Sequence, residues 1–223
     1  MSSAAAPLFV VIAGPAGSGK STLCERLVAA GLGFSRVITT TTRAPRPGEV
    51  NGVHYHFLSP AEFDTRLAAG EFLEWAWVHG ERRYGTLAAS VLEPLARGQN
   101  LVANLDVQGV ASVRQAVERF SQLRRSLVTV FIMLDQDQLV TRIRQRGQDD
   151  EAEIQRRMTT AQAELKEAGK FDHLIHSGTR EEDFAALLKI VESAKNRMQG
   201  RERLSALIYA DKDPSRLSGL DKL

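Results

Sequence analysis

Apolar residues along this chain gather in four short runs, separated by longer stretches in which apolar positions recur with helical spacing. The runs at residues 8–13, 101–105, 127–134 and 173–176 have the length of buried strands. Buried strands that alternate with helices are typical of a mostly parallel sheet that helices cover on both faces. The pattern therefore predicts an α/β fold.

A different pattern fills the interval between the first two runs. Short alternating segments at residues 37–39, 54–57 and 72–79 are broken by prolines and glycines, which indicates a small β-rich lobe. Inside it, Ser59 is expected to cap a helix that has Pro60 at its first position, because an acidic residue follows three positions after the cap.

Trp75 and Trp77 alternate with Glu74 in the last of these segments. The two rings are therefore expected on one face of a strand and Glu74 on the other. The rings could stack on a base, but packing within the lobe is favoured.

Residues 136–165 are highly charged with helical spacing, and residues 147–150 divide them into two helices. Such a hairpin at the carboxyl edge of the sheet could close as a lid. Beyond Gly200 we expect a further short helix and a frayed end. The predicted single domain, 1–223, thus has a core at about 8–36, 98–136 and 165–198, a β-rich lobe at about 37–97, a lid at about 137–164, and a C-terminal helix and tail at about 199–223.

Composition narrows the range of partners. The chain has 29 Lys and Arg against 27 Asp and Glu, and a net charge of +2 gives no general reason to expect nucleic acid or an anionic membrane as a partner. The segment before the first apolar run is too short for a signal peptide, and no apolar run approaches the roughly 20 residues that span a bilayer. We therefore expect a cytoplasmic protein, and self-association into a homo-oligomer stays open.

The cysteine and the histidines give no indication of a disulfide or of a zinc site. Cys24 is the one cysteine, so no internal disulfide can form, and its apolar helix position favours a core thiol. The five histidines have no cysteine partners and no H-E-x-x-H spacing, which favours structural roles over a zinc site.

The most informative motif follows the first apolar run directly. Residues 14–21 match the phosphate-binding loop G-x-x-x-x-G-K-[ST], and they lie between a predicted strand and a predicted helix, the context that this motif requires. Inward-facing N–H groups and the helix N-terminus can replace the water shell of a polyphosphate. We interpret the loop as a nucleoside triphosphate site in preference to a chance glycine-rich turn, with Lys20 on the β- and γ-phosphates and Ser21 on Mg²⁺. The candidate ATP-binding residues are Gly14, Pro15, Ala16, Gly17, Ser18, Gly19, Lys20, Ser21 and Thr22.

A second anion site is suggested by Arg43 and Arg46, which lie three apart in a threonine-rich stretch stiffened by prolines. Guanidinium forks match phosphate oxygens in bidentate fashion, so the pair could clamp a monophosphate. A solvated basic loop would have the same composition, and the segment alone does not separate the two.

Several segments share their order and approximate spacing with one enzyme family. They are Thr41-Thr42-Arg43-x-Pro45-Arg46-x-Gly48-Glu49, then Gly52 and Tyr55, Phe72-Leu73-Glu74, Tyr84-Gly85-Thr86, and Asp106-x-Gln108-Gly109. From about residue 8 to about residue 195, the chain resembles the guanylate kinase family. The resemblance implies a P-loop nucleoside monophosphate kinase, with a parallel-sheet core, an inserted β-rich GMP-binding lobe and a helical lid. It also implies Mg²⁺-dependent transfer of the γ-phosphoryl group of ATP to GMP or dGMP, with ADP and GDP as products.

The same resemblance implies an acceptor site. Arg43, Arg46, Tyr55 and Tyr84 would hold the GMP phosphate, and Thr39, Glu74, Thr86 and Asp106 would read the guanine. Guanine presents N1–H and an N2 amine side by side, and one carboxylate can accept from both, whereas adenine would leave Glu74 unpaired. Glu74 is therefore the expected specificity residue. Thr39 could serve O6 or only satisfy a strand end, and Asp106 could also hold the metal through a water.

The lid arginines are expected to complete the site. The family's R-x-x-x-R-G pattern implies that Arg142 and Arg146, with Arg157 from the second helix, join Lys20 and Arg43 as the catalytic cations. They would stabilise the equatorial oxygens of the moving phosphoryl group while the closed lid excludes water. A solvated helix face is the ordinary interpretation of such charges, and Arg144 is left to solvent.

The chain departs from the family pattern at four places. Asn104 stands where an aspartate is usual, which removes a negative charge near the expected metal shell. The stretch from Glu74 to Tyr84 is one residue longer than usual, and Thr39 replaces a serine. Ser177 lies within His-Ser-Gly where Val-Asn-Asp is usual, so it is expected to take over part of the asparagine's role near the adenine.

Two other functions stay open. A non-catalytic guanylate kinase-like binding module keeps the fold but loses the phosphate loop and the lid arginines, so intact Lys20 and Ser21 weigh against it. A related small-molecule kinase acting on a sugar phosphate would have little use for Glu74 and Tyr84.

Overall fold

The core of the molecule is a parallel sheet of five strands in the order β2-β7-β1-β8-β9. The computed structural model of the chain describes residues 6–78, 82–144 and 151–210. Each of the four predicted apolar runs corresponds to one strand of this sheet, and β2 is added at one edge. The strands are β1 (Phe9–Ala13), β2 (Phe34–Arg36), β7 (Asn100–Asn104), β8 (Leu127–Met133) and β9 (His173–His176). The predicted α/β fold is confirmed.

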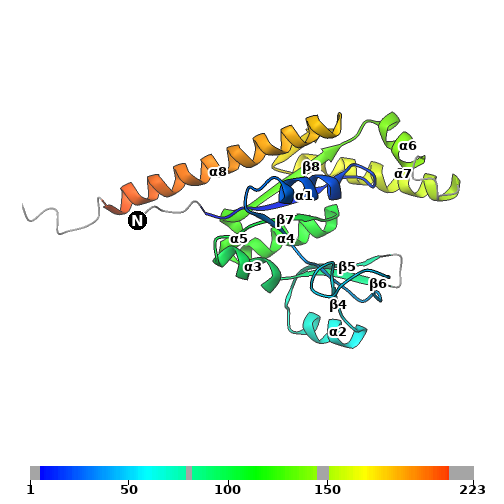
Figure 1. Cartoon of the computed structure of the whole chain (residues 1–223), viewed down its shortest axis with the longest axis horizontal. Helices are drawn as coiled ribbons and strands as arrows, with labels where there is room; N and C mark the ends of the chain where they lie inside the picture. Colours follow the sequence, from blue (N-terminus) through cyan, green and yellow to red (C-terminus); the bar gives the residue numbers. More distant parts are fainter. Residues whose placement is uncertain (1–5, 79–81, 145–150, 211–223) are drawn as a thin grey trace, which may run out of the picture.

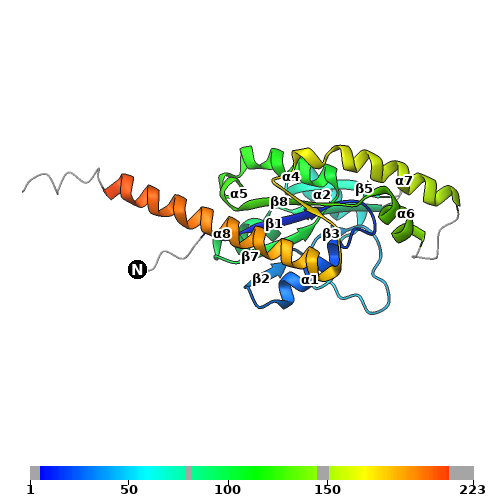
Figure 2. The ribbon, with the colours of Figure 1, turned by 90° about the horizontal axis from the view of Figure 1, so that it is seen from above.

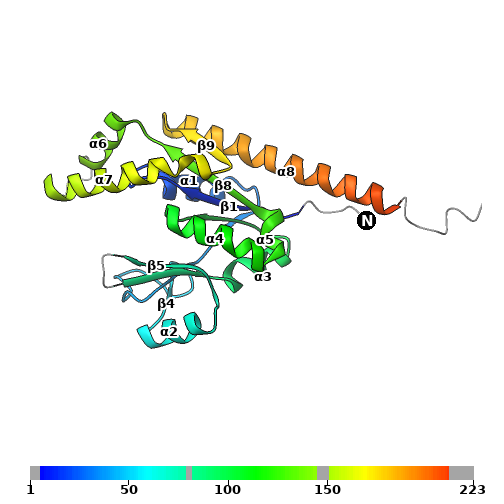
Figure 3. The same cartoon turned by 180° about the vertical axis from the view of Figure 1, so that it is seen from behind.

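Strand β1 is buried on both faces because its side chains alternate between two apolar clusters. Leu8, Val10 and Ile12 pack with α1 and α8, whereas Phe9 and Val11 pack toward α3, α4 and α5. Figures 1 and 2 show α8 lying along one side of the sheet and projecting beyond it, and Figure 3 shows α4 and α5 on the other side. These helices are α1 (Lys20–Ala29), α3 (Ala89–Ala96), α4 (Val107–Arg119), α5 (Ser121–Ser126) and α8 (Arg180–Ala210).

A second sheet, in the order β4-β3-β6-β5, lies below the core in Figure 1. Its strands are β3 (Thr40–Thr41), β4 (His56–Phe57), β5 (Phe72–Val78) and β6 (Arg82–Leu87), and helix α2 (Pro60–Ala68) packs beside it. The predicted cap of α2 is confirmed, since the Ser59 hydroxyl accepts from the Glu62 N–H and the Glu62 carboxylate accepts from the Ser59 N–H.

The alternating segment at residues 37–39, assigned to the β-rich lobe from the sequence, is not itself a strand. This segment is the passage from the first sheet to the second, between β2 and β3. The Val37 N–H donates to the Val102 carbonyl at 2.9 Å, and the Thr39 carbonyl accepts from the His56 N–H at 2.8 Å. Because residues only two positions apart bond to different sheets, no regular ladder forms here, and Thr39 is held at the junction.

The two tryptophans pack on the lobe and lie on the opposite face of β5 from Glu74. Trp75 meets the ring of Phe63 edge-on, and Trp77 lies under the guanidinium of Arg83. Both rings keep a partly exposed surface, whereas Glu74 is buried. The favoured packing role is confirmed.

The charged segment forms α6 (Gln136–Arg144) and α7 (Glu151–Lys166), followed by a short 3₁₀ turn, Ala168–Lys170. The predicted break at residues 147–150 lies outside the described residues. The prediction of a separate helix after Gly200 is wrong, because α8 continues through this glycine to Ala210. A single glycine costs a helix about 1 kcal/mol and does not by itself end it. In the part of the chain that the structure describes, no helix is both long and apolar enough to cross a bilayer.

Candidate active site

The phosphate loop connects the carboxyl end of β1 to α1. Gly14 has φ 144°, and a Cβ there would lie 2.8 Å from the Ile132 carbonyl, so the loop needs glycine at its first position. Gly17 and Gly19 also have positive φ, Pro15 accepts from the Ser18 N–H, and Ala16 is exposed at the tip. Since α1 begins at Lys20 with no side-chain cap, its first N–H groups stay available to an anion.

Lys20 bridges the loop and its surroundings. Its Nζ donates to the carbonyls of Gly14 at 2.6 Å and Pro15 at 2.9 Å. From α7, the carboxylate of Glu164 lies within electrostatic reach of Lys20 and Asp106. Burial raises the pKa of Glu164 to about 6, although the attraction of Lys20 opposes the shift. No motif pointed to Glu164, because only the fold brings α7 over the loop.

A cavity of about 500 Å³ opens beside the loop, and we call it the donor cavity. Its lining includes Gly17, Ser18, Gly19, Thr22 and Leu23 from the loop and α1, Arg142 from α6, and Gly178, Thr179, Arg180 and Asp183 from the far wall. The sequence-predicted residues Gly17, Ser18, Gly19, Thr22 and Arg142 therefore share one cavity.

The far wall of the donor cavity is organised by Asp183, which sequence analysis missed. Its carboxylate accepts from the Ser177 hydroxyl and from the Gly178 N–H, both at 2.8 Å, although only 6% of Asp183 is exposed. Arg142 donates to the Ser177 hydroxyl at 3.0 Å. Asp183 thus fixes the turn between β9 and α8 and orients Ser177, a role that a lone aspartate in a helix's first turn does not signal.

A second cavity, of about 240 Å³, lies between the two sheets, and we call it the acceptor cavity. It brings together residues far apart in sequence, among them Ser21, Arg36, Thr39, His54, Tyr55, Glu74, Tyr84, Asn104 and Asp106. Neighbouring residues of α1 thus face different cavities, because Thr22 lines the first and Ser21 lines the second.

Glu74 is the buried carboxylate of this cavity. Only 8% of the residue is exposed, and its Oε1 accepts from the Thr86 hydroxyl at 2.5 Å. Burial raises the pKa of Glu74 to about 7, the Thr86 bond opposes this shift, and the nearby Asp106 carboxylate adds to it. Thr86 itself is fully buried and contacts Glu74 from the neighbouring strand β6, where the two residues are paired in register.

The start of α4 packs closely against Glu74. Asp106 caps the helix by accepting from the Gly109 N–H at 2.7 Å. A Cβ on Gly109 would lie 3.3 Å from a carboxylate oxygen of Asp106 and 3.3 Å from one of Glu74. The glycine therefore allows both carboxylates to approach the helix.

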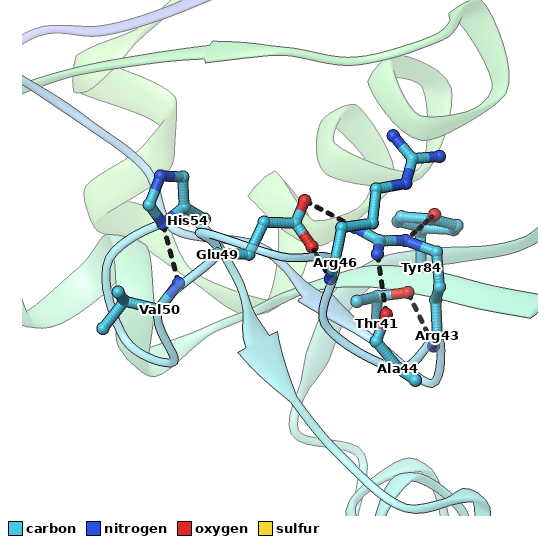
Figure 4. A network of polar contacts seen from close by, with 8 residues as sticks. All are labelled: Thr41, Arg43, Ala44, Arg46, Glu49, Val50, His54 and Tyr84. Atoms are coloured by element: carbon cyan, nitrogen blue, oxygen red, sulfur yellow. Dashed lines mark hydrogen bonds and ion pairs between the residues drawn. The ribbon is translucent and has the colours of Figure 1, made fainter.

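Arg43 is enclosed by partners within the second sheet. Its guanidinium donates to Glu49 at 2.8 Å, to the Ala44 carbonyl at 2.7 Å and to the Tyr84 hydroxyl at 3.3 Å (Figure 4). It also lies near the ring of Tyr55. The guanidinium lowers the pKa of Glu49 to about 2, with help from the Arg46 N–H. Figure 4 shows the Arg46 side chain pointing away from this network, while its backbone N–H donates to Glu49 at 2.7 Å.

Two predicted lid residues cannot be placed. Arg146 lies outside the described residues, and Arg157 lies on α7, where its backbone is described but its side chain is not. Arg142 is the one lid arginine among the three that the structure positions.

The donor set near Ser21 fits a magnesium ion held mainly by phosphates and water. Mg²⁺ in nucleotide sites commonly takes one or two protein oxygens, and Ser21 and Asp106 line the same cavity. Among the described residues, no three His, Cys, Asp or Glu side chains gather into a metal site of their own. Any metal here would therefore depend on the nucleotide.

This fold and these paired cavities define a P-loop α/β protein with a second small-molecule cavity next to its phosphate loop. The guanylate kinase family model matches residues 7–194, so the chain belongs to the guanylate kinase family. The resemblance seen in the sequence is confirmed.

Individual relatives agree with the family assignment. The chain is 41% identical over 191 residues to the guanylate kinase of Idiomarina loihiensis, covering 84% of this chain and 87% of that protein. It is 39% identical over 203 residues to the guanylate kinase of Nitrosococcus oceani, covering 90% and 96%. The crystal structure of guanylate kinase from Anaplasma phagocytophilum aligns with a TM-score of 0.58 at 22% identity over 94% of this chain and 87% of that one, a likeness of fold.

Proposed function

We propose that this protein is a guanylate kinase, which transfers the γ-phosphoryl group of ATP to GMP or dGMP and releases ADP and GDP. One observation carries the proposal: a buried carboxylate, Glu74, lines the same cavity as Ser21 of the phosphate loop. A carboxylate suited to recognising guanine and a residue of the triphosphate-binding loop thus line one cavity. Family membership supports the same reaction.

Glu74 is the proposed reader of the acceptor base. In its ionised form the carboxylate accepts from both N1–H and the N2 amine of guanine, and adenine offers neither donor there. Thr86 orients Glu74 through the 2.5 Å hydrogen bond, while Thr39 and Asp106 complete the base site from the same cavity. Because the free carboxyl has a pKa of about 7, binding guanine draws it fully into the ionised state.

The acceptor phosphate is proposed to bind where Arg43, Tyr55 and Tyr84 meet, with Arg46 added from the loop. Arg43 would release the Glu49 carboxylate and take phosphate oxygens in its place, since both are anions that match its fork. Tyr84 already contacts Arg43 and can donate to the same phosphate. An oxygen of this phosphate then attacks the γ-phosphorus, and the bond to the ADP oxygen breaks.

The donor site is proposed to consist of the phosphate loop with Gly14 through Thr22, and of Ser177 near the base. Lys20 binds the β- and γ-phosphates, and Ser21 would hold Mg²⁺, with Asp106 reached through a water. When bound, Mg²⁺ offsets the negative charge that builds on the phosphate oxygens. Arg142, Arg146 and Arg157 are the proposed lid cations, and Arg142 must leave Ser177 to reach the transferred group.

The two other functions lose support. A binding module has no need of a loop in which glycine geometry and Lys20 are both preserved. A sugar phosphate has no paired donors for a carboxylate buried as deeply as Glu74.

A coupled assay of ADP release tests the proposal directly. We expect Mg²⁺-dependent turnover with GMP, slower turnover with dGMP, and no rate above the no-acceptor background with AMP or UMP. The Lys20→Met variant serves as the control for contaminating kinases. Folded protein that shows no GMP-dependent turnover would exclude the enzymatic function.

A further inference from the structure

Arg36 is a charged residue of the acceptor cavity that no motif identified. It ends strand β2, and its neighbour in the parallel register is Val102 on β7. From this sheet edge the guanidinium reaches Asn104 at the carboxyl end of β7, where it donates to Oδ1 at 3.2 Å. Arg36 therefore faces the cavity from the core sheet, opposite the strands that carry Glu74 and Tyr84.

The charge balance of the cavity gives Arg36 its importance. Of the described residues that line the acceptor cavity, Arg36 is the one arginine or lysine, and it stands against the carboxyl groups of Glu74 and Asp106. Arg43, which contacts Tyr84 of this cavity, has its charge matched by Glu49 at 2.8 Å. Within the lining of this cavity, a dianionic ligand would thus find a positive side-chain charge at Arg36.

Among the residues that the structure describes, no close ion pair engages this guanidinium. The carboxylate of Glu25 lies 4.0 Å away, and the two side chains are 46% and 66% exposed. An exposed pair at that distance contributes little, because water and salt screen it. Most of the N–H donors of Arg36 can therefore turn to a ligand without breaking a structural contact.

The orientation of Asn104 makes the part of the acceptor cavity next to Arg36 suited to an anion. Because Arg36 takes Oδ1, the amide turns Nδ2 toward the Ser21 hydroxyl at 3.4 Å. This part of the cavity thus presents a guanidinium, an amide N–H₂ and a hydroxyl, all of which can donate hydrogen bonds. A carboxylate at position 104 would instead pair with Arg36 and cancel its charge.

We propose that Arg36 binds a phosphate group in the acceptor cavity and is a further acceptor-binding residue, oriented by Asn104. The proposal rests on the function proposed above, and the phosphate is assigned to the acceptor because Arg36 lines the acceptor cavity, whereas the loop residues from Gly17 to Gly19 line the donor cavity. Arg36 and Arg43 would then contact the phosphate from opposite sheets, which fixes its position between them.

Calorimetric titration of GMP, guanosine and ATP into the full-length protein, without Mg²⁺, tests this proposal. Arg36→Met keeps the length of the side chain and removes its charge. It is expected to weaken GMP binding about tenfold, as for a lost hydrogen bond to a charged group, and to leave guanosine and ATP unchanged. Arg66→Met is the matched control, since Arg66 is 43% exposed on α2 and pairs only with Glu71 among the described ion pairs.

Each alternative outcome contradicts a defined part of the proposal. Unchanged GMP binding by Arg36→Met, with normal binding by the wild type, excludes the role of Arg36 and leaves the kinase function standing. Equal losses for GMP and guanosine would mean that Arg36 supports the base site or the fold. Weaker binding of ATP alone would mean that Arg36 contacts the donor nucleotide and not the acceptor. Failure of the wild type to bind GMP would instead contradict the proposed function itself.

Discussion

The phosphate loop and the acceptor cavity offer polar groups to a ligand in different ways. The loop uses backbone N–H groups from one continuous segment, held in place by glycine conformations and by Lys20 on two loop carbonyls. The acceptor cavity uses side chains from both sheets and from the start of α4. A backbone site is thus specified locally, whereas a side-chain site exists only once distant strands have met.

The two regions also differ in how their polar groups are satisfied before ligand arrives. The uncapped start of α1 leaves N–H groups available to phosphate. In the acceptor lobe, Arg43 holds Glu49 and Thr86 holds Glu74. The proposed binding of GMP therefore requires Arg43 to exchange Glu49 for phosphate, whereas at the loop the Lys20 side chain, which donates to two loop carbonyls, has to change partners.

The largest effect on activity should come from substituting Lys20 in the proposed ATP site. Lys20→Met removes the charge that follows the migrating phosphoryl group, so kcat should fall roughly 10⁴-fold. GMP affinity, measured by calorimetry, should stay within about twofold if the two regions bind independently. Because Lys20 also bonds two loop carbonyls, a thermal unfolding scan must accompany the kinetics. A parallel loss of GMP binding would show that the regions are coupled.

Glu74→Gln should impair the use of GMP without affecting the binding of ATP. The amide presents one donor where guanine also donates, so kcat/KM for GMP should fall roughly 10³-fold. The dissociation constant of ATP should not change. Glu71→Gln, three residues earlier and paired with Arg66 at the surface, is the matched control and should behave as wild type. Comparable losses for ATP and GMP would mean that Glu74 supports the structure of the lobe.

A smaller effect should follow from pH. Since burial raises the pKa of Glu74 to about 7, GMP affinity should drop by up to about tenfold per pH unit below that value. Thr86→Val removes a bond that lowers this pKa, so its profile should shift to higher pH. The nucleotide phosphate also titrates near pH 6, and Glu74→Gln, which keeps only that dependence, is the control. Identical profiles for Glu74→Gln and wild type would contradict the assignment.

The same pKa has a consequence for stability in the absence of ligand. A raised pKa in the folded state means that the protonated form of Glu74 stabilises the fold below about pH 4.5, and that this contribution is lost as pH rises through about 7. Glu74→Gln should remove that part of the pH dependence of Tm. A variant that is less stable than wild type at pH 8 would contradict this sign.

Local patterns were sufficient for the loop, the core strands and the cap of α2. Each of these depends on residues adjacent in sequence, such as Ser59 with Glu62 or the glycines with Lys20. The alternating segment at residues 37–39 does not form a strand because the chain crosses between sheets there, and a β-branched segment carries no sign of which sheet it joins. The helix boundary expected at Gly200 was also wrong, since α8 continues past this glycine to Ala210.

Residues that act through long-range contacts could not be found in the sequence. Arg36 matters because β2 pairs with β7 and faces Asn104, and Asp183 matters because α8 begins beside Ser177. Glu164 reaches Lys20 and Asp106 only through the position of α7. The resemblance located Glu74 and Arg43, but their internal partners, Thr86 and Glu49, became clear only in three dimensions.

The close approach at Gly109 limits how this protein could evolve or be redesigned. With oxygens of Glu74 and Asp106 both 3.3 Å from where a Cβ would stand, the wall of the proposed base site is shared by a strand of the second sheet and a helix of the core. Exchanging Glu74 for a larger or differently shaped side chain would press on α4. A change of acceptor base therefore demands coordinated substitutions on both elements, and single mutations should tend to erase guanine preference without creating a new one.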